Sequence, residues 1–417
     1  MVVFVPFVLP GERVEAEVRQ EKGGFARGSV TRLIDASPDR VEARCPYFRQ
    51  CGGCHYQHIP YQRQLEFKAA ILRETLQRIA RIELKSEIRL HASPPWNYRN
   101  RTRLQVRSAP EFALGYFRFG SHEFLPVREC PISSPVLNRV IARLLEVGGL
   151  NCPPAVEEIE LFADAADERL LAWAFCGREA NPEGLLRWAE VLARELPEIS
   201  GVTSFSSRRR VEEAETPDLK VLAQSGAKAI RYRAEGHDYQ VSAGAFFQIN
   251  RHLVDELISV VTGNARGDLA LDLYAGVGLF SVALAESFHH IFGVEASQTS
   301  YGDLVQNVPA NVKAVGARTE DFLRNDCLRS DDPGRRRVRK RPDLVVLDPP
   351  RAGAGKAVIR SLVELGAPRV RYVSCDPGTL ARDIIPLLTA GYHIEEAHLF
   401  DLFPGTFHIE SVMLLAR

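Results

Sequence analysis

The chain has 417 residues, of which 45% are hydrophobic and 25% are charged, and its 53 basic side chains balance its 53 acidic ones. The length allows about two or three domains, and the composition excludes a disordered, collagen-like or coiled-coil chain. Nucleic-acid binding would therefore depend on local basic patches. No uncharged apolar run approaches the roughly 18 residues of a membrane span, and the apolar start, residues 2–9, lacks a basic leader. The eight cysteines are accordingly expected in the cytoplasm, as metal, redox or catalytic thiols.

Three β-branched segments separated by Gly and Pro turns open the chain, namely 2–5, 13–18 and 29–34. Their spacing predicts a small antiparallel sheet or a fragment of a barrel. A helix is predicted over 61–82, because apolar residues recur there on one helical face. This stripe consists of Leu65, Ala69, Leu72, Leu76 and Ile79. From about 87 to 240, strand and helix patterns are mixed, without an internal repeat.

The last third of the chain has the pattern of a parallel sheet. Short, nearly continuous apolar runs alternate there with helical patterns, which indicates βαβ units and buried strands. The runs are 269–273, 291–294, 312–315, 344–347 and 370–373. Two more strand segments, 393–400 and 408–416, follow without a helix between them. The expected fold is α/β, a doubly wound Rossmann-like sheet with an antiparallel end.

A glycine-rich turn, residues 272–279, closes the first of these strands and opens a helix, so that the backbone can approach a ligand closely. Glu295 ends the second strand, at the distance from Asp272 where an acidic residue binds ribose hydroxyls. The third glycine of a dinucleotide fingerprint is missing, and there is no phosphate loop. These features favour a nucleoside without a pyrophosphate, such as S-adenosylmethionine, over a turn that merely packs.

Chemically active side chains stand at the ends of further strands. Asp348 ends the fourth strand, Cys375 ends the fifth, and Glu410 opens the final antiparallel strand. Ligands of open α/β sheets bind outside the carboxyl ends of the strands. All three side chains are therefore expected on one rim, together with Asp272 and Glu295.

Methylation of a pyrimidine at C5 would use such a rim. C5 is a poor nucleophile towards a methyl sulfonium, but addition of a thiolate at C6 makes it enolate-like, and removal of the C5 proton then lets the thiol leave by elimination. Cys375 and Glu410 can supply the nucleophile and the base. The site should also favour the thiolate, because an unperturbed thiol is only a few per cent ionised at neutral pH. The alternatives are a buried packing cysteine and a solvated carboxylate.

Over nearly its whole length the chain resembles the RNA uracil-5 methyltransferases, whose motifs it carries in the same order. The motifs are Phe246-Phe247-Gln248-Ile249-Asn250, the Asp272 turn, Asp348-Pro349-Pro350-Arg351, Ser374-Cys375-Asp376-Pro377 and residues 403–410. The resemblance implies a class I methyltransferase domain with Cys375 as nucleophile and Glu410 as proton acceptor. It also implies that S-adenosylmethionine is contacted by Gln248, Tyr274, Glu295 and Asp348.

Four further cysteines, Cys45, Cys51, Cys54 and Cys130, offer a thiolate set that suits either zinc or an iron–sulfur cluster, and their spacing alone does not choose. Unrelated core cysteines are the alternative. The resemblance implies a [4Fe-4S] cluster on these positions and a substrate in 23S rRNA, because the tRNA-acting branch looks to lack the set. A folding or RNA-binding role is expected, since methyl transfer needs no electron. Packing roles are expected for Cys152, Cys176 and Cys327.

Two features point to RNA contacts. Arginines and aromatic residues alternate between Trp96 and Arg107 without an acid, which suits single-stranded RNA, although a solvated strand face would look the same. The segment 4–12 resembles the middle of an RNA-binding TRAM domain, a small OB-like barrel whose preceding strands are missing here. The basic run 335–341 is expected to be a surface loop. The uridine itself must be unpaired or flipped into the rim pocket.

These observations predict three parts. Residues 1–44 form a truncated TRAM/OB-like barrel, 45–240 an α+β RNA-binding domain with the cysteine cluster, and 241–417 the methyltransferase domain, on which the helical segment 57–88 packs. The expected function is S-adenosylmethionine-dependent C5 methylation of a uridine in 23S rRNA. The alternatives are the same reaction on tRNA, a catalytically silent RNA-binding protein, and an amino methyltransferase that would not need Cys375. Neither a membrane nor an obligate protein partner is expected.

Overall fold

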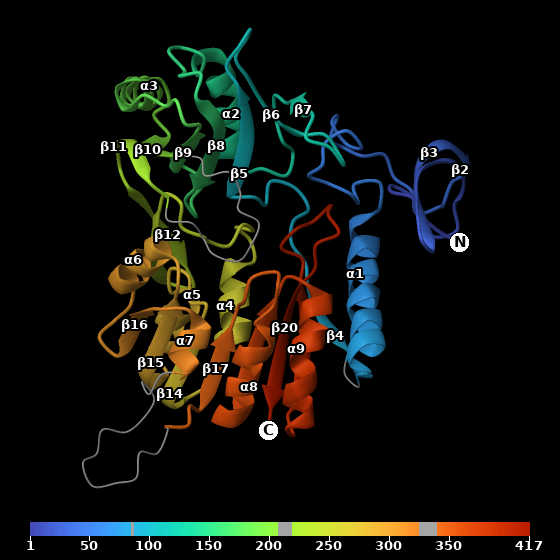
Figure 1. Cartoon of the computed structure of the whole chain (residues 1–417), viewed down its shortest axis with the longest axis vertical. Coiled ribbons are helices and arrows are strands. Elements are labelled where there is room, and N and C mark those ends of the chain that lie inside the picture. Colours follow the sequence, from blue (N-terminus) through green and yellow to red (C-terminus); the bar gives the residue numbers. More distant parts are fainter. Residues whose placement is uncertain (85–86, 207–218, 325–339) are drawn as a thin grey trace.

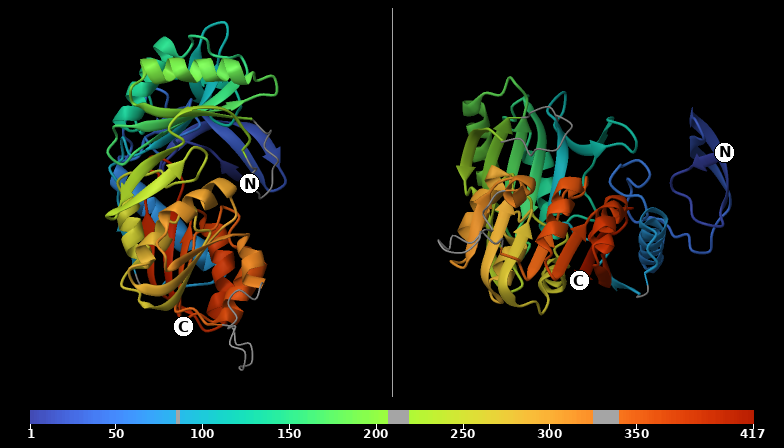
Figure 2. Two further views of the ribbon diagram at one scale, coloured as in Figure 1. Left: turned by 90° about the vertical axis from the view of Figure 1, so that its left-hand side faces the viewer. Right: turned by 60° about the horizontal axis from the view of Figure 1, so that its bottom comes forward.

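The computed structural model describes residues 1–84, 87–206, 219–324 and 340–417. In Figure 1 a seven-stranded sheet stands above an eight-stranded sheet, and a small N-terminal sheet lies to one side of both. The turned views of Figure 2 show the same separation. Among the helices of the described residues, none has the length and hydropathy that a membrane crossing requires.

The eight-stranded sheet has the strand order β16-β15-β14-β17-β18-β20-β19-β4. Its strands are β4 Ile88–His91, β14 Gly267–Leu273, β15 Phe288–Glu295, β16 Val312–Gly316, β17 Leu344–Leu347, β18 Arg369–Ser374, β19 His393–Phe400 and β20 Glu410–Ala416. Pairing is parallel from β16 through β18, and β20 runs antiparallel to both of its neighbours. The predicted α/β sheet with its antiparallel end is thus confirmed. The eighth strand, β4, comes from far upstream and pairs in parallel with β19.

Helices cover both faces of this sheet because its strands are apolar on both sides. One face packs on α4 Val254–Thr262 and α5 Leu279–Leu284, and the other on α1 Tyr61–Thr75, α7 Thr319–Arg324, α8 Gly355–Leu365 and α9 Pro377–Thr389. The helix α6 Gln298–Asn307 follows β15. On β20, Val412 contributes to the first core and Met413 to the second, as alternation along a strand requires.

The helix predicted over 61–82 is α1 followed by a π-helical turn, Leu76–Ala80. Leu65, Leu72 and Leu76 of the apolar stripe are buried, and the helix packs against α9. Ile79 is 41% exposed instead of buried. The reason is the π-helical turn, whose extra residue rotates the stripe away from the sheet.

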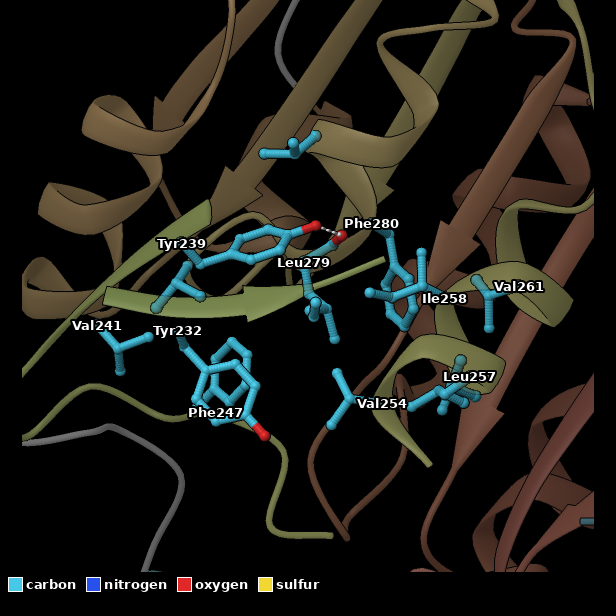
Figure 3. Close-up of a cluster of buried hydrophobic side chains, with 14 of the residues drawn as sticks. Tyr232, Tyr239, Val241, Phe247, Val254, Leu257, Ile258, Val261, Leu279 and Phe280 are labelled. Carbon is cyan, nitrogen blue, oxygen red and sulfur yellow. Dashed lines mark hydrogen bonds between the residues drawn. The ribbon is translucent and has the colours of Figure 1, made fainter. Parts of the chain in front are cut away.

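A two-stranded hairpin, β12 Ala229–Ala234 and β13 His237–Ser242, lies against the eight-stranded sheet. Figure 3 shows its Tyr232 and Tyr239 beside Phe247 and the apolar side chains of α4. The Tyr239 hydroxyl donates to the Leu279 carbonyl oxygen at 3.1 Å. The boundary expected between 240 and 241 therefore falls inside β13.

The seven-stranded sheet has the order β11-β10-β9-β8-β5-β6-β7. Its strands are β5 Arg101–Arg107, β6 Ala113–Phe117, β7 Phe124–Pro126, β8 Val156–Ala163, β9 Leu170–Cys176, β10 Ile199–Ser206 and β11 Val221–Gly226. The helices α2 Pro135–Val147 and α3 Pro182–Glu195 share its core. Cys176 is buried in that core and Cys152 packs at its edge, which confirms their packing role, whereas Cys327 lies outside the described residues.

The N-terminal sheet has the order β1-β3-β2, with β1 Val2–Phe4, β2 Arg13–Lys22 and β3 Phe25–Asp35. The hairpin of β2 and β3 is antiparallel, but β1 pairs in parallel with β3, so the antiparallel prediction is wrong for β1. The cause is the segment after β1, which crosses to the far side of β3 before β2 begins. Within the described residues these strands form an open sheet and do not close into a barrel.

Candidate active site and cysteine cluster

A small hollow of about 30 Å³ lies over the carboxyl ends of β14 and β17. Gln248 lines it from the loop before α4, Tyr274 from the turn after β14, and Asp348 from the end of β17. Three of the four side chains expected at the cofactor therefore share one wall. The same wall includes Phe246 and Gly276.

The fourth expected residue, Glu295, holds the glycine-rich turn in place. Its carboxylate accepts the backbone N–H of Gly276 at 2.8 Å and that of Ser297 at 2.6 Å. Gly278 has φ +95°, and a Cβ there would lie 2.8 Å from Leu304 Cδ1. A side chain at this position would be strained by the positive φ and would crowd Leu304 of α6. The turn thus depends on both its glycine and the Glu295 carboxylate.

Two buried carboxyl groups, Asp272 and Asp348, face each other below this turn. Burial raises the pKa of each to about 7, and the charge of Asp272 adds to the effect on Asp348. Asp272 accepts a hydrogen bond from the Ser281 hydroxyl at 2.6 Å, but its Oδ1 has no partner within the described part of the chain. This arrangement favours a ligand that brings a positive charge or hydrogen-bond donors.

Cys375 and Glu410 stand opposite each other at the end of the same sheet. Ser374 of β18 pairs in register with Ser411 of β20, so the residues just beyond this pair, Cys375 and Glu410, meet at the rim. Burial and the nearby Asp348 raise the pKa of Glu410 well above its usual range. The structure thus brings together the thiol and the carboxylate on the predicted rim.

The expectation that the surroundings favour the thiolate is wrong for this arrangement. Burial, followed by the charges of Glu410 and Asp348, raises the pKa of Cys375 to about 12, and Arg351 only partly opposes them. Arg351 donates to His408 Nδ1 at 2.8 Å, and burial together with Arg351 lowers the pKa of His408 to about 4. Sequence reasoning gave these two residues no role, although both stand inside the quoted motifs.

The loop between β19 and β20, which leads to Glu410, is tied to the segment around α1 (Figure 1). Lys68 and Asp401 form a fully buried ion pair of 2.6 Å, and Lys68 also donates to the Phe403 carbonyl oxygen at 3.0 Å. Breaking a buried pair by removing one partner typically costs about 3–5 kcal/mol. Sequence reasoning missed Lys68, because a lysine on a helix usually lies in solvent.

The same loop is also held next to the cysteines. The Gly405 carbonyl oxygen accepts the backbone N–H groups of His55 and Tyr56, both at 2.8 Å, and the Tyr98 hydroxyl donates to the Pro404 carbonyl oxygen at 3.1 Å. His55 directly follows Cys54 in the chain. The segment that bears Cys54 therefore contacts the loop that positions Glu410.

The four candidate ligand cysteines gather between the two large sheets. Cys45, Cys51 and Cys54 precede α1, and Cys130 lies between β7 and α2. The charge of Cys130 raises the pKa of the other three thiols, while burial is the main reason that the pKa of Cys51 is about 11 and that of Cys54 about 12. No group of three or more His, Cys, Asp or Glu side chains in the described ranges is arranged to hold a metal ion.

The arginines predicted to contact RNA mostly serve the protein itself. Arg101 donates to the Ala245 carbonyl oxygen at 2.6 Å and lies over the Phe162 ring. Arg103 pairs with Glu160 at 2.6 Å on the neighbouring strand β8. The interpretation of this stretch as an RNA contact does not suit Arg101, whose side chain is only 12% exposed and is occupied by groups distant in sequence. For Arg103, whose side chain is 44% exposed, it stays a prediction.

Comparison with known proteins identifies the family of this chain. The family model for tRNA (uracil-5-)-methyltransferase matches residues 227–417. A 23S rRNA (uracil(1939)-C(5))-methyltransferase of Halomonas elongata is 33% identical, over 99% of this chain and 84% of its own. An RNA methyltransferase of Streptomyces avermitilis is 32% identical, over 99% of this chain and 92% of its own.

A solved structure extends the likeness to the fold. The tRNA (uracil-54, C5)-methyltransferase of Pyrococcus abyssi, in complex with S-adenosyl-L-homocysteine, has a TM-score of 0.73 and 25% identity, and the match covers 100% of this chain and 96% of that one. The eight-stranded sheet thus has the class I methyltransferase fold. From the two sequence relatives and the shared fold, the chain belongs to the RNA (uracil-5-)-methyltransferases, enzymes that methylate C5 of uracil in RNA.

Proposed function

We propose that this enzyme transfers a methyl group from S-adenosylmethionine to C5 of a specific uridine in 23S rRNA. The observation that carries the proposal is the meeting of Cys375 and Glu410 at the rim beside the hollow. The Halomonas relative named for 23S rRNA and the presence of four clustered cysteines favour the ribosomal substrate. The same reaction on tRNA is the second candidate, favoured by the Pyrococcus structure and the name of the family model.

Gln248, Tyr274, Glu295 and Asp348 are the residues that we propose to contact S-adenosylmethionine. The lining of the hollow suits this ligand because it includes the Asp348 carboxyl group, which can pair with a positively charged group of the ligand. S-adenosylmethionine supplies an electrophilic methyl group on a sulfonium. Its demethylated product, S-adenosyl-L-homocysteine, is present in the Pyrococcus structure.

Cys375 and Glu410 divide the work on the uracil ring. The Cys375 thiolate adds to C6, which makes C5 nucleophilic, and C5 then takes the methyl group of S-adenosylmethionine, which would leave as S-adenosyl-L-homocysteine. Glu410 takes the remaining proton from C5, so that the Cys375–C6 bond breaks and the double bond returns. The raised pKa of Glu410 makes its ionised form a stronger base than an ordinary carboxylate. Arg351, which lowers the pKa of both side chains, favours their charged forms.

Nucleoside mass spectrometry of fragmented 23S rRNA and of tRNA, from cells with and without the gene, tests this function. The loss of one 5-methyluridine from a 23S rRNA fragment, restored by the intact gene, is the expected result. Loss of 5-methyluridine from tRNA alone would support the same reaction with tRNA, the second candidate, as the substrate. If both RNA classes keep all their 5-methyluridine, the proposed function is rejected.

For the other parts of the chain we propose the division given by the sequence, with 1–44 and 45–240 serving RNA binding and 241–417 catalysis, except that the hairpin of β12 and β13, residues 229–242, goes with the catalytic part on which it packs. We further propose that Cys45, Cys51, Cys54 and Cys130 hold a [4Fe-4S] cluster. Two observations support this proposal: Cys54 and Cys130 pack in one small cluster, and four thiols are the donor set that a [4Fe-4S] cluster takes. Each ligand of a four-iron cluster binds a separate iron, so these thiols need not be as close together as the ligands of a single ion.

Replacement of Cys54 by serine is expected to remove the iron. Iron and acid-labile sulfide are measured in anaerobically purified protein, together with the visible absorption band of the cluster. Cys152→Ser is the matched control, because this thiol is also partly buried but packs at the edge of a different core. The cluster proposal fails if wild-type protein contains no sulfide, or if Cys54→Ser and Cys152→Ser contain as much iron as the wild type.

A further inference from the structure

A row of ring contacts extends from the catalytic rim to the N-terminal sheet. We name it the aromatic strip and define it as Phe7, Phe119, His55, Phe407 and His408. Ring centroids are 4.9 Å apart for Phe7 and Phe119, 5.9 Å for Phe119 and His55, 4.3 Å for His55 and Phe407, and 4.6 Å for Phe407 and His408. Each ring therefore contacts the next one.

The strip joins segments that are far apart in the sequence. Phe7 lies between β1 and β2, Phe119 follows β6, His55 follows Cys54, and His408 stands two residues before Glu410. The strip thus begins at the proposed base and ends near the N-terminal sheet. Any strand of RNA that places a uridine at Cys375 has its neighbouring nucleotides close to this row.

Two rings of the strip are open to solvent. Phe119 is 38% exposed and Phe407 is 48% exposed, although each also packs against His55. Exposed aromatic rings in a row offer stacking surfaces that every base can use, because every base has a π-face.

A cation lies beside the strip at its catalytic end, where the Arg351 guanidinium donates to His408 Nδ1 at 2.8 Å. A guanidinium group at this place favours a polyanionic partner such as RNA over a basic protein segment.

We propose that the aromatic strip binds the unpaired nucleotides on one side of the target uridine by stacking their bases on Phe407 and Phe119. The proposal rests on the proposed position of the uridine at Cys375 and Glu410. It makes the strip a binding surface for single-stranded RNA that continues from the catalytic rim. Because stacking tolerates any base, the strip would position the substrate without reading its sequence.

The test measures binding of a fluorescein-labelled oligouridylate of about 12 nucleotides, a length within the site sizes of single-strand binding proteins. Phe407→Ala and Phe119→Ala are each expected to raise the Kd about tenfold, whereas Phe407→Tyr keeps a ring and should bind like the wild type. Leu186→Ala, on the exposed side of α3 and far from the strip, is the matched control for loss of a surface apolar side chain.

A second measurement distinguishes loss of stacking from loss of folding. For this measurement the probe carries the fluorescent base 2-aminopurine next to the end without fluorescein. The wild type and Phe407→Tyr should quench the fluorescence of 2-aminopurine by stacking on it, and Phe407→Ala should not. Equal Kd values for the wild type and both alanine variants would overturn the proposal. If the proposed function is wrong, cellular RNA keeps its 5-methyluridine when the gene is absent. That outcome is measured separately from binding of the probe, so the two proposals can fail independently.

Discussion

Cys375→Ala is expected to lower methyl transfer by at least about a thousandfold, because no other group in the proposed reaction makes the bond to C6. The measurement follows radiolabelled methyl groups from S-adenosylmethionine into transcribed 23S rRNA. In parallel, RNA that contains 5-fluorouridine should trap the wild-type enzyme covalently, since fluorine at C5 cannot leave as a proton. Cys375→Ala should form no such adduct.

The control for this prediction is Cys152→Ser, which should methylate and become trapped as the wild type does. An adduct formed by Cys375→Ala would contradict the assignment of the nucleophile.

The pH dependence of alkylation tests the raised pKa of Cys375 in the protein without ligand. Because burial, Glu410 and Asp348 raise the pKa of the thiol to about 12, modification of Cys375 by iodoacetamide should rise about tenfold per pH unit from neutral towards alkaline pH.

Glu410→Gln is expected to stop the reaction one step later. Addition to C6 and methylation of C5 precede loss of the C5 proton, so the variant should accumulate a covalent, methylated enzyme–RNA complex on ordinary uridine. Turnover should fall by roughly a hundredfold to ten-thousandfold, the usual contribution of a positioned base. Denaturing gel electrophoresis with labelled RNA and labelled methyl groups measures both the adduct and the released product.

Glu395→Gln is the matched control for Glu410→Gln, since Glu395 lies on the adjacent strand β19 with its side chain 44% exposed. Unfolding cannot explain the expected loss, because removing a buried charge beside Asp348 relieves repulsion and should leave the melting temperature equal or higher. If Glu410→Gln releases product at the wild-type rate, another base takes the C5 proton, and Asp348 is the nearest remaining carboxyl group whose charge influences Cys375.

The catalytic half of the molecule was predictable because its signals are local. Continuous apolar runs such as 344–347 identify strands that are buried on both faces, and the residue after each run must lie at the carboxyl rim. The antiparallel final strand returns Glu410 to Cys375, which the register of β18 and β20 confirms. The roles assigned to these residues stay predictions until the variants are measured.

Other features could not be predicted from local patterns. The strand β4 has four residues and no distinctive alternation, and its place beside β19 depends on where α1 packs. Arg103 looks like a free cation in its own segment and is paired with Glu160 only after β5 and β8 meet. The aromatic strip could not be predicted either, because its rings come from four separate segments that meet only in the folded chain.

The sequence by itself determined the order of the strands along the chain, the glycine turn, and the placement of Cys375 and Glu410 at strand ends, because periodicity and strand ends are properties of neighbouring residues. Only the tertiary structure decided the charge environment of that site. The pKa of Cys375 depends on Glu410 and Asp348, and the loop before Glu410 depends on Lys68, hundreds of residues upstream. Such charge and packing interactions act over a few ångströms in space. No pattern along the chain shows which distant side chains will lie that close together.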